Sequence, residues 1–227
     1  MQRLKRYVTL LMVGLTVLGT AATVPDHCHS TTGAGVPLFH EHTAFHPDTV
    51  PIMPRGSWHA KAPRPYKKHV PVQITVHHEG GKLLTLTDDA KQRLWNVQHW
   101  CMGPDRNWSD IPYHLLIAPD GTVYQGRDPL TVGETNTEYD PTGHLLICFL
   151  GNYNQQSLDN NLLQVLIRLL VDSCIKYGIS PTDISTHRDH SQQTACPGED
   201  IYSYFKSGYV VDEVTKLLNA EKATINH

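Results

Sequence analysis

The chain has 227 residues, of which 40% are hydrophobic and 18% are charged, and its formal net charge is −3 at pH 7. This length is enough for one domain with its own core plus extensions. The mildly acidic balance argues against a polyanion as the main ligand, so we expect no nucleic acid among its partners.

The first 22 residues predict a secretory signal peptide. Arg3, Lys5 and Arg6 precede an apolar run over residues 7–18, and small residues follow up to Ala22. Cleavage there removes these three positive charges and takes the formal charge from −3 to −6. An uncleaved anchor reaching to Val24 is the alternative, but that stretch is short for a bilayer span. We therefore expect a secreted or periplasmic protein with no stable membrane insertion once the leader is cleaved.

A segment rich in Pro, Thr, Gly and His follows at residues 23–50 and shows neither a helical nor a strand period. Such a composition predicts a flexible linker. A metal-gathering tail is the alternative, because the segment contains five histidines. These are His27, His29, His40, His42 and His46.

From Pro71 onward, strand and helix patterns alternate. Residues 72–77 read as a buried strand. Thr87 is placed to cap a helix over residues 88–101, because acidic residues follow it and Gly103 lies beyond the end. Asp120-Gly121 between two apolar runs predicts a hairpin over residues 113–127.

The second half of the domain follows the same logic. Residues 144–151 are apolar on both faces, as expected of a central strand. A helical period covers residues 159–177 and Gly178 supplies the stop. The chain is therefore predicted to fold as an α/β protein. A single domain, residues 51–210, has a central mixed β-sheet flanked by α-helices, and residues 211–227 form a C-terminal helix or tail.

The loop over residues 186–198 carries the main chemical signal. His187 and Cys196 lie on it, and His77 ends the strand at residues 72–77, which together offer two nitrogens and one sulfur. Three protein ligands with one open position suit a hydrolytic zinc site. Sequence proximity alone is weak support, because the chain has 15 histidines and 5 cysteines.

The remaining cysteines leave the redox state open. If Cys196 binds a metal, four cysteines remain and allow three disulfide pairings in an oxidising compartment. They are Cys28, Cys101, Cys148 and Cys174. Cys148 and Cys174 sit in apolar contexts and could equally be buried free thiols.

Five segments in a fixed order carry a family resemblance. They are PRGSWHAKAP with Arg55 and Trp58, VHHE, WSDIPYHLLIAPDGTVYQGR, ICFLGNYN and HRDHSQQTACPG. In this order, over residues 51–205, the chain resembles the family of peptidoglycan recognition proteins and zinc-dependent type-2 N-acetylmuramoyl-L-alanine amidases. The resemblance implies Zn²⁺ as cofactor, peptidoglycan and muropeptides as partners, and hydrolysis of the amide between N-acetylmuramic acid and L-alanine.

The resemblance also implies roles for single residues. His77, His187 and Cys196 match the zinc ligands, and Tyr113 matches the catalytic tyrosine. Relatives that only bind peptidoglycan often have serine in place of Cys196. Thr194 occupies a position where phage enzymes carry lysine and animal amidases often threonine, and it could serve as a second donor to the oxyanion.

Glu79 departs from the family, in which threonine or serine is more common. In a strand it faces the same side as His77. It is thus a candidate general base or partner of a ligand imidazole. A solvated carboxylate at the strand end is the alternative.

Two further departures concern loops. Nine positions separate His187 from Cys196 where relatives usually show eight, which makes His190 a rival ligand. In residues 132–146, Glu134 and Asp140 stand where relatives show histidine and asparagine, so the resemblance implies no contact with saccharide or peptide at these two positions.

The resemblance also bears on the substrate. Trp108 and Arg127, nineteen residues apart, match a pair that faces meso-diaminopimelate in relatives, and an arginine fork suits its extra carboxylate. The glycine that precedes this tryptophan in relatives is Asn107. His99 and Asn152 are further candidates for substrate contacts. Structural roles for Trp108, Arg127, His99 and Asn152 are the alternatives.

The leading hypothesis is a monomeric, exported zinc amidase that acts on peptidoglycan of the diaminopimelate type. A peptidoglycan-binding module without catalysis is the chief alternative. A zinc peptidase is disfavoured because the chain has no H-E-x-x-H helix.

Overall fold

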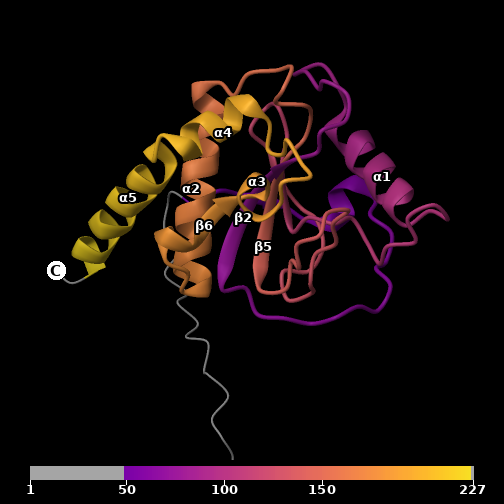
Figure 1. Cartoon of the computed structure of the whole chain (residues 1–227), viewed down its shortest axis with the longest axis horizontal. Helices are drawn as coiled ribbons and strands as arrows, with labels where there is room; N and C mark the ends of the chain where they lie inside the picture. Colours follow the sequence, from indigo (N-terminus) through magenta and orange to yellow (C-terminus); the bar gives the residue numbers. More distant parts are fainter. Residues whose placement is uncertain (1–48, 226–227) are drawn as a thin grey trace, which may run out of the picture. The chain divides into compact units, whose positions relative to one another are not determined.

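The structure is a computed structural model that describes residues 49–225. A six-stranded sheet forms the centre of this part of the chain (Figure 1). The strand order is β1-β4-β3-β5-β2-β6, and β3–β4 is the one antiparallel pair among the named strands. The strands are β1 (Ile52–Met53), β2 (Gln73–His78), β3 (Leu115–Ile117), β4 (Val123–Gln125), β5 (His144–Phe149) and β6 (Ile184–Thr186). This mixed sheet, with the helices around it, confirms the predicted fold class. The predicted leader and nearly all of the 23–50 linker lie outside the described residues.

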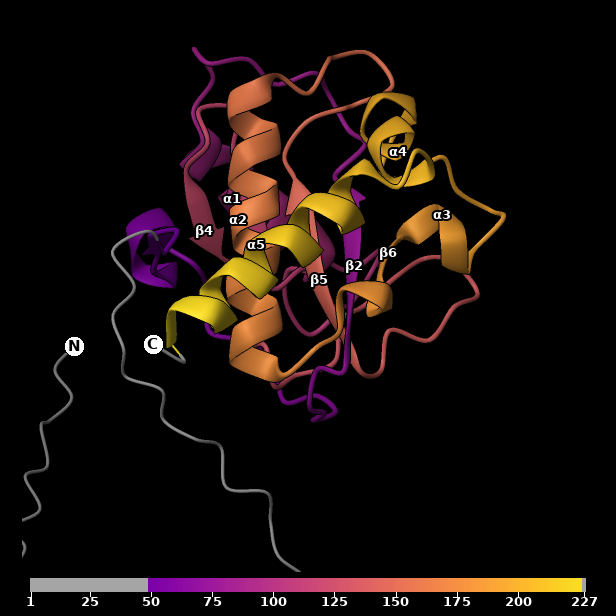
Figure 2. The same cartoon turned by 90° about the vertical axis from the view of Figure 1, so that its left-hand side faces the viewer.

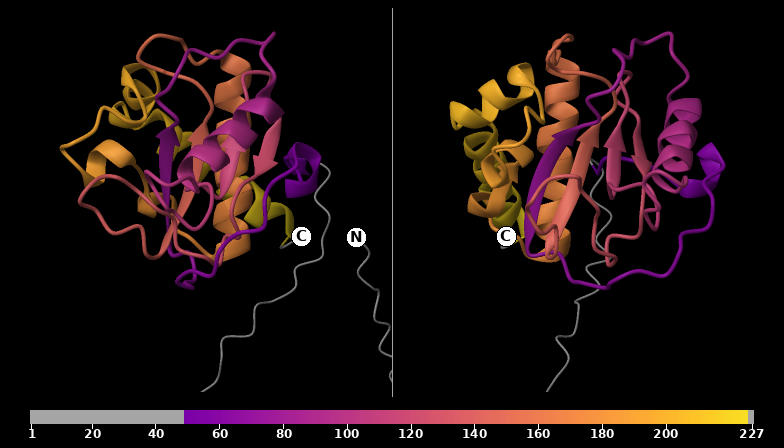
Figure 3. Two further views of the ribbon diagram at one scale, coloured as in Figure 1. Left: turned by 90° about the vertical axis from the view of Figure 1, so that its right-hand side faces the viewer. Right: turned by 45° about the vertical axis from the view of Figure 1, so that its right-hand side comes forward.

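Helices cover both faces of the sheet (Figures 2 and 3). One face carries α2 (Asn160–Tyr177) and α5 (Tyr209–Ile225), with α4 (Glu199–Lys206) near its edge. The other face carries α1 (Ala90–Cys101) and the short η1 (Arg55–Trp58). Each side has its own apolar cluster, and central strands β2 and β5 are buried almost throughout. This burial on both faces explains why residues 144–151 contain no alternating polar positions.

The helices predicted over residues 88–101 and 159–177 both form, with one correction. Asp159 caps α2 by accepting from the Leu162 N–H, and Gly178, with φ of 67°, ends the helix. The first helix begins later than expected, because Asp89 and not Thr87 accepts from the Gln92 N–H. The carboxylate of Asp88 instead closes a turn with the N–H of Thr85.

The C-terminal segment takes the helical alternative. Helix α5 runs to Ile225, and Val210, Val214 and Leu218 bury their side chains in the cluster shared with α2. The predicted boundary at residue 210 therefore falls inside a helix that completes the core. The short η2 (Pro181–Asp183) and α3 (His187–His190) flank β6.

The described cysteines are free thiols. Cys101, Cys148, Cys174 and Cys196 are all buried and none of them forms a disulfide, while Cys28 lies outside the described residues. This confirms the free-thiol alternative for Cys148 and Cys174. Among residues 49–225, we find no helix with the length and apolar character needed to cross a membrane.

Candidate active site

The parallel pairing of β2 with β6 brings two histidines together. In this register Val76 lies opposite Thr186, so the next residues along the two strands are His77 and His187. Their ring centroids are 4.7 Å apart. Both side chains are buried at the carboxyl edge of the sheet. Strand register, rather than a local motif, therefore places the first two candidate ligands.

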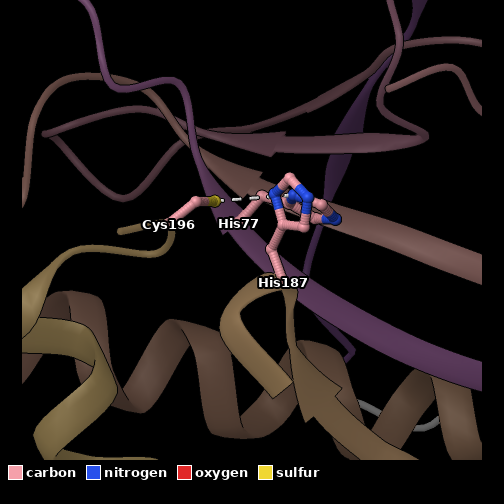
Figure 4. Close-up of side chains that lie close together, drawn as sticks. All are labelled: His77, His187 and Cys196. Carbon is pink, nitrogen blue, oxygen red and sulfur yellow. Dashed lines mark hydrogen bonds between the residues drawn. The ribbon is translucent and has the colours of Figure 1, made fainter. Parts of the chain in front are cut away.

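Cys196 reaches the same point from the loop after α3. Its sulfur lies 3.5 Å from His77 Nδ1 and accepts a hydrogen bond from the His78 N–H at 3.3 Å. The candidate ligand atoms of His77, His187 and Cys196 all lie within 4.8 Å of one another (Figure 4). The sequence prediction of one His-His-Cys cluster is thus reproduced in space.

The spacing within the cluster fits zinc. Zinc–nitrogen bonds of about 2.0–2.1 Å and zinc–sulfur bonds of about 2.3 Å, at a tetrahedral angle, place nitrogen and sulfur about 3.5 Å apart. The Nδ1–sulfur distance between His77 and Cys196 matches this value. Two imidazoles and a thiol are also a donor set that zinc commonly uses. The residues present therefore fit the ion that the family resemblance implies.

Burial keeps all three donors neutral. It lowers the pKa of His77 well below its usual value, with nearby His187 adding to the effect, and it lowers the pKa of His187 to about 4. Burial also raises the pKa of the Cys196 thiol to about 12, against the hydrogen bond from the His78 backbone. Neutral imidazoles are ready to bind a metal, whereas the thiol must lose its proton to do so. A divalent cation would stabilise the thiolate in this pocket.

His190, the rival ligand, points elsewhere. The single turn of α3 places its Nε2 2.6 Å from the Ser185 hydroxyl, and its ring packs edge-on against His144. It does not belong to the His-His-Cys cluster. The geometry therefore favours His187. Cys196 belongs to the cluster, and Gln192 and Gln193 of the same loop are exposed.

Tyr113 and Thr194 lie beside the cluster. The Tyr113 ring is centred 5.3 Å from that of His77, and burial raises the pKa of its hydroxyl well above 10, so it remains a hydrogen-bond donor. Thr194 accepts from the Cys196 N–H at 3.0 Å, which leaves its own O–H free to donate into the same pocket. Both predicted positions are compatible with contact to a bound carbonyl oxygen.

Glu79 lies at the pocket but is engaged by Arg93 of α1. Both carboxylate oxygens accept from this guanidinium, one from Nε at 2.9 Å and the other from an Nη. This two-pronged ion pair joins the end of β2 to α1. The geometry favours a structural carboxylate over a general base, and we find no bond from Glu79 to His77 among the described contacts.

A pocket of about 390 Å³ opens over the cluster. Its walls include Trp108, Tyr113 and Glu134 beside the three donors. His99 and Asn152 do not line it. His99 stacks on Trp95 along α1, and the Asn152 amide donates to backbone oxygens of Gly80 and Gly81. Of the four predicted substrate contacts, Trp108 alone faces the pocket directly.

Arg127 requires a correction. Its side chain is 1% exposed, and its guanidinium donates to the backbone oxygens of Ile111, Asp110 and Val132 and to the Glu134 carboxylate. Every arm of the fork thus has an internal partner. The expectation that Arg127 presents this fork to a substrate carboxylate is wrong in this structure, and its structural alternative is supported.

Sequence reasoning missed two residues that contact the candidate histidine ligands. The Thr137 hydroxyl lies 2.7 Å from His187 Nε2, and the Tyr139 hydroxyl lies 3.3 Å from His77 Nε2. They belong to an aperiodic segment, so no pattern marks them. The available signal was the departure of residues 132–146 from the family pattern.

Arg55 and Trp58 have structural roles at the entry to the domain. The Trp58 indole is 1% exposed and donates to the Gln125 backbone oxygen, and Arg55 pairs with Asp110 at 2.9 Å. They fasten the start of the domain onto the hairpin. Asn107 adopts a left-handed φ of 51°, a conformation that asparagine tolerates better than most residues.

Comparison with known proteins bears out the resemblance. Residues 67–199 match the family described as N-acetylmuramoyl-L-alanine amidase. Peptidoglycan recognition protein 1 of Bos indicus is 31% identical over 155 residues, which cover 66% of this chain and 80% of the relative. Peptidoglycan-recognition protein SC1a of Drosophila melanogaster is 32% identical over 128 residues, covering 56% and 68%.

Solved structures agree with this assignment. Peptidoglycan recognition protein SD of Drosophila superposes with a TM-score of 0.63 and 28% identity, covering 69% of this chain and 94% of that one. The N-acetylmuramoyl-L-alanine amidase LysC of Clostridium intestinale superposes with a TM-score of 0.56 and 25% identity, covering 75% and 99%. The chain belongs to the family of N-acetylmuramoyl-L-alanine amidases and peptidoglycan recognition proteins.

Proposed function

We propose that this protein is a zinc-dependent amidase that hydrolyses the bond between N-acetylmuramic acid and L-alanine in peptidoglycan. The observation that carries the proposal is the cluster of His77, His187 and Cys196 at the base of an open pocket. The similarity to LysC, named as an amidase with this specificity, supports it.

The three clustered side chains would hold the zinc ion. When bound, zinc supplies Lewis acidity that activates water for attack on an amide carbonyl. The protein's own part is to hold the two imidazoles neutral in a buried site and to leave one side of the cluster open to the pocket. Cys196 releases its proton on binding, so metal affinity is expected to rise with pH.

Tyr113 and Thr194 would stabilise the negative charge that develops on the carbonyl oxygen. Both residues line the pocket, and each hydroxyl carries a proton that it can donate. Donors fixed in a water-poor site before the reaction lower the barrier without reorganising during it. We assign Glu79 a structural role through its ion pair with Arg93, and a role as general base is the alternative.

Substrate binding would centre on the pocket wall at Trp108 and Glu134. Because every nitrogen of the buried Arg127 guanidinium already bonds to an internal partner, it lends no support to a preference for diaminopimelate-type peptidoglycan. That preference therefore rests on Trp108 alone. Export across the plasma membrane and a monomeric state complete the proposal.

Binding without catalysis is the second candidate function. It is favoured by the similarity to peptidoglycan recognition protein 1, whose name states recognition and not hydrolysis. Cys196 separates the candidates, since the resemblance associates cysteine at this position with cutting and serine with binding alone.

Digestion of purified sacculi tests the proposal. The purified protein, with the leader removed, should contain about one zinc per chain and release muropeptides with free L-alanine amino termini, identified by mass. Chelation should abolish release, and added zinc should restore it. Cys196→Ser should lose turnover while still sedimenting with sacculi. Activity that survives chelation, or zinc-loaded protein that binds sacculi without cutting them, would refute the proposed amidase.

A further inference from the structure

The loop over residues 135–139, here the threonine–tyrosine loop, contacts both candidate histidine ligands from one side. Thr137 meets His187 and Tyr139 meets His77, in each case at the Nε2 atom. The two contacts come from one short stretch between the hairpin and β5. This stretch supplies no ligand of its own.

Both contacts leave Nδ1 as the nitrogen free to face the metal. In His77, Nδ1 is the atom that lies 3.5 Å from the Cys196 sulfur. In His187, the Thr137 hydroxyl occupies Nε2 at 2.7 Å. A histidine that binds a metal through one nitrogen carries a proton on the other, which then needs an acceptor. A hydroxyl oxygen is a suitable acceptor in each case.

The loop itself is held in place. The Thr137 N–H donates to the Thr135 hydroxyl at 3.2 Å, and the two threonine hydroxyls are 2.9 Å apart. Between the two contact residues, Glu138 accepts from the Ser191 hydroxyl at 2.7 Å, which ties the loop to the segment after α3. The Tyr139 ring packs 5.0 Å from that of His187. The hydroxyls therefore meet the imidazoles in a fixed geometry.

We propose that Thr137 and Tyr139 are positioning residues that hold the outer nitrogens of His187 and His77 and so turn both Nδ1 atoms toward the metal. This deepens the proposed function and rests on its zinc site. Partners of this kind typically change metal affinity or activity by about 10–100-fold when they are removed. They act through the ligands and need not touch the substrate.

Zinc affinity of the purified protein tests the proposal directly. Metal-free protein is titrated with zinc in competition with a chromophoric chelator. Thr137→Val and Tyr139→Phe should each raise the zinc Kd by about tenfold or more. Thr137→Ser keeps the hydroxyl and should therefore bind zinc far more tightly than Thr137→Val, with most of the roughly tenfold loss avoided. Thr215→Val and Tyr209→Phe, at positions on α5 away from the site, are matched controls and should leave the Kd unchanged.

Cobalt substitution supplies a second readout. At saturating cobalt, the visible absorption of Thr137→Val and Tyr139→Phe should shift relative to the parent protein, because the orientation of a ligand ring changes. Tyr139→Phe keeps the aromatic packing and decides the question if Thr137→Val does not fold. Unchanged affinity and spectrum in folded Tyr139→Phe, or equal losses in Thr137→Ser and Thr137→Val, would overturn the positioning role. If the parent protein binds no zinc, the proposed function fails together with this inference. If it binds zinc without cutting sacculi, the amidase activity fails alone.

Discussion

Two buried polar regions lie close together in this protein, and only one has the character of a site. In the cluster of His77, His187 and Cys196, three donor atoms face one another at the base of a pocket. In the network around Arg127, each guanidinium arm is bonded to a backbone oxygen or to Glu134. Buried groups with internal partners hold the fold together. Donors that converge on one another leave room for something to be bound.

Arg127 offers the largest expected effect and the clearest way to break this comparison. Arg127→Met removes the charge partner of the part-buried Glu134 carboxylate and leaves it the hydrogen bonds from Ser109, and loss of one member of a buried ion pair costs about 3–5 kcal/mol. We expect a fall of that size in the free energy of unfolding, measured in urea. Adding Glu134→Gln should recover part of it, because the unpaired charge is removed.

The same Arg127 variant should keep its relative turnover of lysine-type and diaminopimelate-type muropeptides. A variant of normal stability that loses discrimination between them would reverse the comparison. Arg127 would then be a substrate contact, as the sequence suggested.

A change at Tyr113, beside the His-His-Cys cluster, tests whether this region acts on a substrate. Removing one fixed donor to a developing oxyanion typically costs about 10²–10³ in kcat. We expect Tyr113→Phe to show this loss in sacculus digestion, with zinc content and unfolding midpoint unchanged. Tyr209→Phe serves as the matched control. Loss of zinc in Tyr113→Phe would mean that this tyrosine acts on the metal site and not on the substrate.

His114 is a buried polar group with internal partners, like Arg127, and a change there is expected to have a smaller effect on stability. Its Nδ1 accepts from the Leu146 N–H at 2.7 Å and its Nε2 donates to the Thr131 oxygen at 2.9 Å. Burial lowers its pKa to about 3. The ordinary pKa of histidine is 6.5. As the pH falls below this value, His114 binds a proton in the unfolded chain but stays neutral in the folded protein. Stability is therefore lost on acidification.

The expected loss through His114 is about 2 kcal/mol between pH 6.5 and 5. Urea unfolding across this range measures it in the metal-free protein. His114→Gln should flatten the pH dependence by this amount, whatever its effect on stability at neutral pH. An equally steep dependence in the variant would show that the folded protein protonates His114 in this range.

The sequence predicted what depends on strand order and on short motifs. Apolar runs fixed the central strands, and the identity of His77, His187 and Cys196 followed from a resemblance that the comparisons bear out. Register then brought the histidines together, because two parallel strands that end at the same edge carry their next residues side by side. These features depend on local pattern and topology.

The wall of the pocket could not be predicted in the same way. The spacing of Trp108 and Arg127 does not reveal that Glu134, seven residues beyond the arginine, turns back to bind it. Thr137 and Tyr139 lie in a segment without period, where the positions of side chains follow from the path of the loop. The sequence predicts Thr87 as the cap of α1, whereas Asp89 caps the helix in the structure. Asp88, between them, accepts a hydrogen bond from the Thr85 N–H in a turn that precedes the helix. Contacts made by loops are decided in three dimensions.

Strand β2 has a consequence for the lifetime of a bound ion. It lies between β5 and β6, hydrogen-bonded to both and buried under helices, so its amides should be among the slowest to exchange with deuterated solvent. His77 is thus fixed to the most persistent part of the molecule, whereas Cys196 is carried by a loop. If the cluster binds zinc as proposed, the residence time of the ion would be set by opening of that loop, a local movement, and not by the global unfolding rate of the domain.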